Sequence, residues 1–244
     1  MTIETGETNG TKGTKTGAGT IRVLIVDDER LFAELLRVAL RSATGIEVVD
    51  VVHDVSTAVR RMSELRPDVV LADYHLPDGT GADIARTVRV TLPDTSVLIL
   101  TGDPSVSILS DVARSGAVGH LTKDRPFDEV VEGVRSASLG EILFAPSELQ
   151  RLLLERESRP RPLEPLTARE LEVLQLLAEG ASTALASEQL GISSATLRAH
   201  VQAILRKLGA HSRLEAVAEA ARLGVITLDA WTRERTPSRP KEAV

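Results

Sequence analysis

Three acidic residues, a threonine and a lysine stand at equivalent places along the chain. Each ends or closely follows a short, apolar, β-branched run: Asp27 and Asp28 after 23–26, Asp73 after 69–72, Thr101 after 97–100 and Lys123 after 118–121. Such runs, separated by segments with helical periodicity, are typical of strands in a buried parallel sheet. In sheets of this kind, chemistry collects at the carboxyl ends of the strands. The sequence therefore predicts that these side chains meet at one edge of a sheet.

This set of side chains suits phosphoryl transfer onto a carboxylate. Mg²⁺ prefers oxygen ligands, which Asp27, Asp28 and Asp73 would supply. Asp73 would also attack phosphorus, as carboxylates do in aspartyl-phosphate chemistry. Lys123 would neutralise phosphoryl oxygens, and Thr101 would donate a hydrogen bond to one of them. Each residue alone has a simpler interpretation as a helix cap or a solvated charge, so the prediction depends on their joint occurrence.

The elements that must position these residues form one α/β module. Strands are predicted near 22–26, 47–52, 69–72, 96–100 and 118–121, and helices near 30–42, 55–65, 81–91, 105–115 and 127–138. Pro67 and Pro93 end helices ahead of the next strand. Five βα units predict a doubly wound, five-stranded parallel sheet in a module of about 120 residues.

Residues 166–226 predict an all-helical module. Thr167 and Glu170 have the spacing of a capping box, and the helix that they begin ends at Gly180. Further helices are predicted over 182–190, 195–208 and 213–223. Two helices joined by a tight turn at Gly191 are typical of a helix-turn-helix. In that motif the second helix enters the major groove of DNA by its N-terminal end.

Composition and charge agree with two modules that have different partners. The 244 residues carry a formal charge of −6, but residues 21–145 hold 13 Lys and Arg against 20 Asp and Glu, whereas residues 146–244 hold 14 against 13. Cysteine is absent, which excludes disulfides and cysteine-based zinc sites. No apolar run approaches the ~18 residues that a membrane span needs, and the Thr- and Gly-rich start lacks the apolar core of a signal peptide. We therefore expect a cytoplasmic protein without a membrane segment.

These patterns divide the chain into five segments. They are a disordered tail at 1–20, the α/β module at 21–140, a helical and Pro-rich linker at 141–165, the helix-turn-helix module at 166–226 and a C-terminal tail at 227–244. The linker begins with a predicted helix over 147–157. Pro160, Pro162 and Pro165 follow it and favour a semi-rigid tether.

Four pieces of the first module form a recognisable set: Leu24 to Asp28, Ala72 to Gly79, Leu100 to Gly102 and Gly119 to Lys123. They resemble the receiver domains of two-component response regulators. The resemblance implies that a sensor histidine kinase phosphorylates Asp73, while Asp27, Asp28 and the backbone carbonyl of His75 help to hold Mg²⁺. It also implies a switch formed by Thr101 and His120, the latter at a position where Tyr or Phe is commoner in the family.

Four pieces of the second module form another set: Leu166 to Leu174, Ile192 to Val201, Ile204 to Leu208 and Arg213 to Ala216. They resemble the DNA-binding domains of the NarL/LuxR class. The resemblance places Arg198, Ala199 and Gln202 at bases or nearby phosphates, where these side chains suit guanine, the thymine methyl group and adenine respectively. Further contacts to phosphates, or caps of the helix, are expected from Ser193, Thr196, Arg206 and Lys207.

The second module departs from its family pattern at the start of the short helix. Thr183 and Ala184 replace an Asn followed by a basic residue, and Ala186 and Ser187 replace an Ile-Ala pair. The loss of a basic contact to a phosphate is expected to weaken non-specific affinity for DNA. The smaller residue at 186 is expected to loosen the packing of that helix.

Together the two modules predict a phosphorylation-controlled transcription regulator that binds promoter DNA as a homodimer and is not an enzyme acting on a separate substrate. One alternative is an α/β phosphotransfer enzyme, but such enzymes need a cap or specificity insertion and the loops here are short. Another is a helical module that docks a protein. The stretch 192–213, with four bases and no acids, favours DNA. We also expect the acidic module to dock on this stretch and mask it until Asp73 is phosphorylated.

Overall fold

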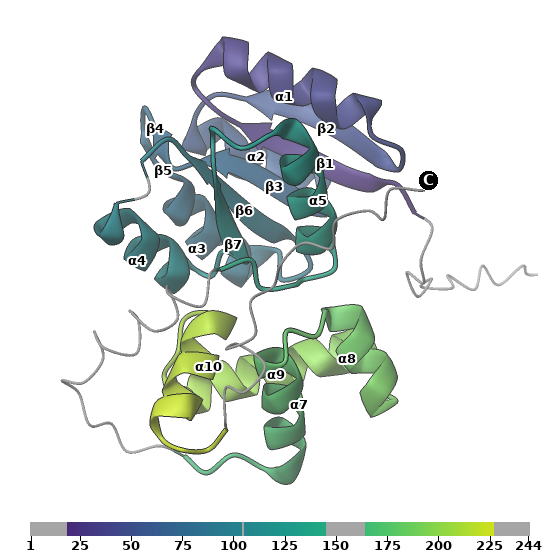
Figure 1. Ribbon diagram of the computed structural model, residues 1–244, viewed down its shortest axis with the longest axis vertical. Helices are drawn as coiled ribbons and strands as arrows, with labels where there is room; N and C mark the ends of the chain where they lie inside the picture. The colour runs from purple at the N-terminus through teal and green to yellow at the C-terminus, as the bar shows by residue number, and fades with distance from the viewer. Residues whose placement is uncertain (1–18, 104, 145–163, 227–244) are drawn as a thin grey trace, which may run out of the picture.

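The computed structural model describes residues 19–103, 105–144 and 164–226 of the chain. These residues form an α/β domain and a helical domain that pack against each other (Figure 1). The fold class predicted from the sequence is thus confirmed. The predicted helix over 147–157 and nearly all of the Pro-rich linker fall outside the described residues, as do most of the N-terminal tail and the C-terminal tail.

The α/β domain is built on a five-stranded parallel sheet with the order β2-β1-β3-β6-β7. Its strands are β1 (Ile21–Val26), β2 (Ile46–Val52), β3 (Val69–Asp73), β6 (Ser96–Thr101) and β7 (Gly119–Thr122). β2 lies on one side of β1, and β3, β6 and β7 follow one another on the other side. The connections from β1 and β3 therefore leave in opposite directions, which opens a crevice at the carboxyl ends of these two strands. All five residues of β3 are buried, as expected for a central parallel strand.

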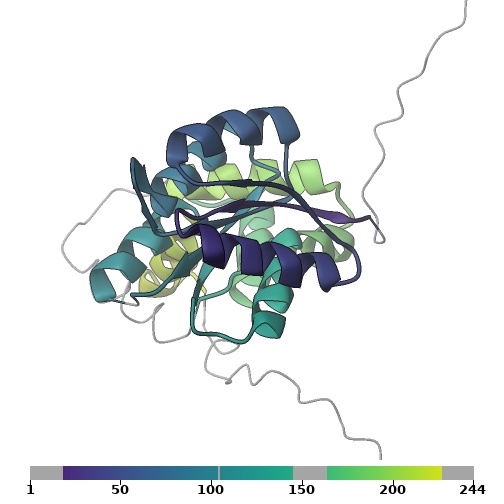
Figure 2. The same cartoon turned by 90° about the horizontal axis from the view of Figure 1, so that it is seen from above.

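Five helices cover the two faces of this sheet: α1 (Arg30–Ser42), α2 (Val55–Leu65), α3 (Gly81–Thr91), α4 (Val106–Ser115) and α5 (Phe127–Ser138). The helices α1 and α5 pack on one face, and α2, α3 and α4 pack on the other. Figure 2 shows α1 and α2 on opposite sides of the strands. The chain therefore forms two apolar layers around the sheet, which hold the strand ends in fixed positions.

A small hairpin that the sequence did not predict follows β3. Its strands, β4 (His75–Leu76) and β5 (Gly79–Thr80), are two residues each, too short to show periodicity in the sequence. Asp78 at its turn accepts hydrogen bonds from the Ser56 hydroxyl and from the backbone N–H groups of Val55 and Ser56. These bonds, the Ser56 hydroxyl first, lower the pKa of Asp78. The hairpin is thereby attached to the start of α2.

The helical domain contains α7 (Ala168–Ala178), α8 (Thr183–Leu190), α9 (Ser194–Leu208) and α10 (Arg213–Arg222). The predicted capping box is present, since Thr167 and Glu170 cap each other at the start of α7. The side chain of Ser193 accepts a hydrogen bond from the N–H of Thr196, so Ser193 is the cap of α9. Gly191 takes the left-handed conformation that ends α8 and makes the tight turn between the two helices.

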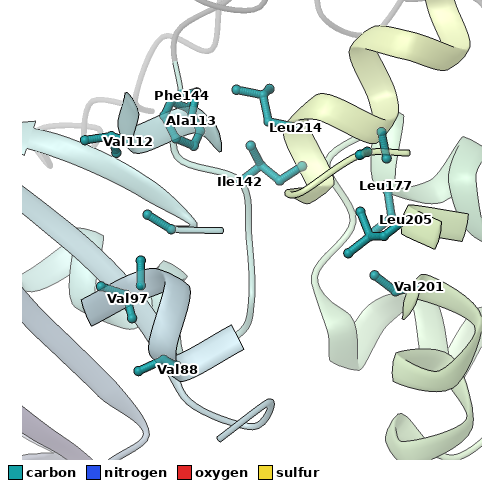
Figure 3. Packing of buried hydrophobic residues seen from close by; sticks show 14 of the residues in the cluster. Val88, Val97, Val112, Ala113, Ile142, Phe144, Leu177, Val201, Leu205 and Leu214 are labelled. Atoms are coloured by element: carbon teal, nitrogen blue, oxygen red, sulfur yellow. The ribbon is translucent and has the colours of Figure 1, made fainter. Parts of the chain in front are cut away.

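One apolar cluster runs from the α4 side of the sheet into the helical domain. Ile142 and Phe144, which follow α5, face Leu214 of α10 across the contact between the domains (Figure 3). α10 packs against α4 at this contact. Within the described residues, no helix is both long and apolar enough to cross a membrane.

Candidate phosphoacceptor site and DNA-reading helix

The carboxyl edge of the sheet brings together Asp27, Asp73 and Lys123. Asp27 directly follows β1, Asp73 ends β3 and Lys123 directly follows β7. Both carboxylates are buried, with 1% of Asp27 and 5% of Asp73 exposed. Burial of two acids at one place requires a compensating positive charge.

Lys123 supplies that charge. Its Nζ lies 2.9 Å from Asp73 Oδ2, 3.0 Å from Asp27 Oδ2 and 2.8 Å from Glu29 Oε1. The same nitrogen lies 4.7 Å from the centroid of the Phe32 ring, which adds a cation–π contact. Burial alone would lower the pKa of Lys123, but the hydrogen bonds to Glu29, Asp73 and Asp27 raise it. The ammonium therefore remains charged and holds the three carboxylates together.

The carboxylate cluster also has the chemistry of a divalent-cation site. Oxygen atoms of Asp27, Glu29 and Asp73 all lie within 4.8 Å of one another. Burial raises the pKa of Asp27 although Lys123 opposes this effect. Asp27 Oδ2 is buried and, apart from its ion pair with Lys123, has no well-directed hydrogen-bond donor among the described residues. A cation bound here would stabilise this charged and incompletely satisfied oxygen, so the residues fit Mg²⁺.

The members of this cluster differ in part from the predicted metal ligands. Asp28 is exposed and lies outside the cluster, whereas Glu29 lies within it. The N–H of Glu29 donates to Asp27 Oδ1, which turns the chain so that the Glu29 side chain faces the site. The run of three consecutive acids is the signal in the sequence that could have pointed to Glu29. His75, whose carbonyl is a predicted ligand, donates its N–H to Asp73 Oδ1 at 3.3 Å.

The backbone beside Asp73 is closely packed. Gly81 begins α3, and its N–H donates to the carbonyl of Tyr74. A Cβ at residue 81 would clash with the carbonyl oxygen of Asp73 and lie 2.9 Å from the Ile99 side chain. Glycine at this position therefore allows α3 to approach the end of β3 and fixes the direction of the strand that carries Asp73.

The two predicted switch residues lie on β6 and β7. Thr101 is fully buried, and its hydroxyl proton is donated to the carbonyl of Asp103. His120 is partly buried, and its ring lies 5.9 Å from the ring of Phe144. Because Phe144 belongs to the cluster that continues into the helical domain, His120 is in contact with the surface that joins the domains.

The face of α9 predicted to contact DNA is turned partly towards the α/β domain. Arg198 Nε forms an ion pair of 2.8 Å with Asp94 Oδ1, which lies in the loop between α3 and β6. A cavity of about 90 Å³ between the domains is lined by Arg198, Val201, Gln202 and Leu205 from α9. Ala199 and Arg206 are exposed, and Ser193 and Thr196 bond to each other at the start of the helix.

Both domains match known families. Residues 23–135 match the response regulator receiver domain, and residues 164–220 match the bacterial regulatory proteins of the luxR family. This chain is a response regulator with a LuxR-type DNA-binding domain. The helical domain is accordingly its DNA-binding output, and α8 and α9 are the two helices of its helix-turn-helix.

Named relatives agree with this assignment over nearly their whole length. The chain is 32% identical to the uncharacterized transcriptional regulatory protein YxjL of Bacillus subtilis, covering 84% of this chain and 97% of that protein. It is 36% identical to the probable transcriptional regulatory protein NarL of Mycobacterium tuberculosis, covering 83% and 94%. A LuxR-family response regulator structure from Aurantimonas has 28% identity and a TM-score of 0.51, covering 57% and 99%. The response regulator described here is therefore a transcriptional regulator.

Lys207 of this response regulator has a structural partner. Its Nζ lies 2.7 Å from Glu170 Oε2, with only 12% and 6% of the two side chains exposed. Arg206, by contrast, has 65% of its side chain exposed and pairs loosely with Glu164 at 3.2 Å. Of the two predicted contacts to phosphates, Arg206 is thus free to reach DNA, and Lys207 first stabilises the domain.

Replacement of Glu170 by Gln is expected to destabilise the response regulator by about 1 kcal/mol at neutral pH, because it removes a charged, buried hydrogen-bond acceptor. Burial alone would raise the pKa of Glu170, but hydrogen bonds from Lys207 and Thr167 lower it. A lowered pKa stabilises the fold above the ordinary pKa of Glu, and this stabilisation is lost as pH falls through the lowered value. Thermal melting of both proteins between pH 3 and pH 7 should show the difference shrinking with acidity.

The matched control for this substitution is Glu172→Gln. Glu172 stands on the same helix and pairs with Arg169, but 55% of its side chain is exposed. Exposed pairs contribute little to stability, so this variant should melt like the wild type. An equal loss of stability in both variants, or a loss that does not depend on pH, would refute the role given to Glu170.

The departures from the family pattern lie at the start of α8. Thr183 is its first residue and Ala184 is exposed. Ala186 is completely buried, and Ser187 donates its hydroxyl to the carbonyl of Thr183. The small residue at 186 is therefore part of the core of the output domain, and looser packing of α8 stays a prediction.

Proposed function

We propose that a sensor histidine kinase phosphorylates Asp73 in the presence of Mg²⁺ and that this controls promoter binding by a homodimer of this regulator in the cytoplasm. The observation that carries the proposal is the buried group of Asp27, Asp73 and Lys123, joined by bonds of 2.9–3.0 Å. It stands at the carboxyl edge of a receiver domain whose chain also carries a LuxR-type output domain. Such a buried acid–lysine group is suited to accept a phosphoryl group and has no need of a substrate pocket.

The chemistry follows from these residues. An oxygen of Asp73 forms a bond to phosphorus, and the bond between phosphorus and the donor breaks with its electron pair leaving on the donor. Lys123 gives up part of its contact with Asp73 and donates hydrogen bonds to the phosphoryl oxygens instead. Mg²⁺, held by Asp27, Asp73, the carbonyl of His75 and either Asp28 or Glu29, would supply the charge that neutralises the phosphoryl group. The Thr101 hydroxyl then leaves Asp103 and donates to a phosphoryl oxygen.

The arrangement of the domains supports masking as the means of control. Arg198, the predicted contact to guanine, is paired with Asp94 of the receiver domain and so is not available to a base. Movement of Thr101 would allow His120 to move, and the His120 ring contacts Phe144 at the joint between the domains. Phosphorylation would therefore weaken the packing that holds α9 against the receiver domain. Phosphorylation can shift the balance between the masked and open states only by the difference in its interaction free energy with the two states, a few kcal/mol at most.

The alternatives of a phosphotransfer enzyme and of a protein-docking output are less well supported. The named relatives are transcriptional regulators, and the helical domain matches a DNA-binding family. The direct experiment is genome-wide mapping of bound sites for the wild-type chain and for Asp73→Asn. Sites bound by the wild type and lost in Asp73→Asn would support the proposal. Equal occupancy in both would refute control through Asp73, and absence of any bound site would refute the DNA-binding function.

A further inference from the structure

A second joint between the domains lies where α5 ends. The carbonyl of Leu139 accepts a hydrogen bond of 2.9 Å from the N–H of Thr183. The carbonyl of Gly140 accepts one of 2.7 Å from Arg213 Nη1, and the same nitrogen donates to Thr183 Oγ1 at 3.2 Å. The end of one receiver helix is thus bonded to the first residues of α8 and α10, both in the output domain.

The polarity of these groups is complementary. The last carbonyls of a helix and the first N–H groups of another have no partner inside their own helices, and they carry opposite partial charges. Here the end of α5 and the start of α8 satisfy each other, and the Arg213 cation adds to the positive side. Burial, together with the positive charge of Arg198, lowers the pKa of Arg213. Among the described residues its hydrogen-bond partners are a carbonyl and a hydroxyl, with no carboxylate.

The joint also depends on a glycine. Gly140 has φ +73°, a left-handed conformation that other residues rarely adopt. A Cβ at this position would lie 2.5 Å from Thr183 Oγ1 and 3.0 Å from Arg213 Nη1. Real Cβ atoms essentially never approach another atom to 2.5 Å, so a larger residue at 140 would force the Thr183 side chain at the start of α8 to move. Thr183, one of the residues that depart from the family pattern, is therefore a component of the contact between the domains.

We propose that Leu139, Gly140, Thr183 and Arg213 form a latch that sets the balance between the closed, masked state and the open, DNA-binding state. The inference rests on the proposed function, since opening is expected to permit DNA binding, but the latch itself is defined by the relative position of the domains. Its hydrogen bonds lie at the end of α5, whereas the ion pair between Arg198 and Asp94 joins α9 to the loop between α3 and β6. Gly140 and Thr183 belong neither to the phosphoacceptor site nor to the predicted DNA contacts, so weakening the latch through them should open the chain and leave both sites intact.

The test compares Gly140→Ala with Gly45→Ala in the unphosphorylated full chain. Gly45 has φ +79°, and a Cβ added there would have no neighbour within 4 Å, so both variants carry the same backbone strain but only Gly140→Ala meets the latch. The chain has no cysteine, so spin labels can be placed at Val38→Cys in the receiver domain and Leu185→Cys in the output domain, both exposed. Distances between the labels, measured by pulsed electron paramagnetic resonance, report opening without DNA.

Gly140→Ala should move a substantial part of the population to longer distances, whereas Gly45→Ala should keep the wild-type distribution. Thr183→Ala removes the hydroxyl that the new Cβ meets but keeps the backbone N–H. The double variant Gly140→Ala/Thr183→Ala should accordingly return towards the closed distance. If Gly140→Ala does not fold, Arg213→Met in the same labelled chain should lengthen the distances through loss of its two hydrogen bonds.

Unchanged distances in folded Gly140→Ala or in Arg213→Met would overturn the latch, as would an equal shift in Gly45→Ala. Affinity for DNA gives an independent readout, and unphosphorylated Gly140→Ala should bind a specific fragment at least several-fold more tightly than the wild type. Longer distances without tighter DNA binding would uphold the latch and contradict masking in the proposed function. The two failures are therefore distinguishable.

Discussion

Asn in place of Asp73 should abolish the incorporation of phosphate from a small phosphodonor such as acetyl phosphate with Mg²⁺. The amide keeps the size of the side chain but is not a nucleophile, and it loses the charge that pairs with Lys123 at 2.9 Å. The wild-type chain should gain one phosphoryl group, labile to base as expected for an acyl phosphate. Intact-protein mass spectrometry before and after base treatment measures both properties. Phosphate that persists in Asp73→Asn would show that another residue is the acceptor.

The same assay distinguishes the residues that hold the cation. Asp27→Ala should raise the Mg²⁺ concentration needed for phosphorylation, because it removes a buried oxygen that is incompletely satisfied among the described residues. Asp28→Ala and Glu29→Ala form a matched pair of neighbouring acids, one outside the cluster and one within it. A larger change for Glu29→Ala would assign the ligand to Glu29. A larger change for Asp28→Ala would show that the loop rearranges when Mg²⁺ binds.

Arg198→Ala should weaken specific DNA binding by the phosphorylated chain by about 1–3 kcal/mol, roughly 5- to 150-fold, and relax preference at one base position. The arginine has two roles, since it is paired with Asp94 in the masked state and is the predicted contact to guanine in the open state. Asp94→Ala removes only the first role. Because 72% of the Asp94 side chain is exposed, its removal should cost little stability and should increase binding by the unphosphorylated chain. Fluorescence anisotropy at fixed salt measures both affinities.

A contrast with Arg206→Ala separates base recognition from attraction to phosphates. Arg206 is exposed near the end of α9, so its loss should weaken binding to all sequences similarly and flatten the dependence of affinity on salt. If Arg198→Ala behaved like Arg206→Ala, with equal losses on specific and unrelated DNA, the assignment of base contact to Arg198 would be wrong.

The arrangement at the sheet edge was predictable because it depends on few residues and one geometric rule. Parallel strands end at the same edge, so residues that end β3 and β6 or follow β1 and β7 must come close to one another. Glu29 was harder to predict, because its inclusion depends on a bond from its N–H to Asp27 that turns the chain. The β4–β5 hairpin has strands of two residues, and patterns of that length carry no periodicity.

Contacts between distant residues were the least predictable part. Lys207 stands on a basic stretch of sequence, but its burial against Glu170, 37 residues away, appears only once α7 and α9 pack. Charge favoured docking of the acidic module on the basic stretch, and the pair of Arg198 with Asp94 agrees with this. In the ion pair of Arg114 with Glu215, however, the base belongs to the α/β domain and the acid belongs to the helical domain. Apolar contacts through Ile142 and Phe144 also join the domains, and net charge does not reveal such packing.

Control of DNA binding through Asp73 is tested most directly by the affinity of the full chain for one genomic fragment, measured by fluorescence anisotropy at matched salt before and after phosphorylation of Asp73. We expect binding to be tighter by on the order of 10-fold after phosphorylation, within the range of allosteric coupling energies, and we expect no response in Asp73→Asn. Equal affinity of the phosphorylated and unphosphorylated wild-type chain would contradict the claim that the phosphoacceptor site controls the DNA-reading helix.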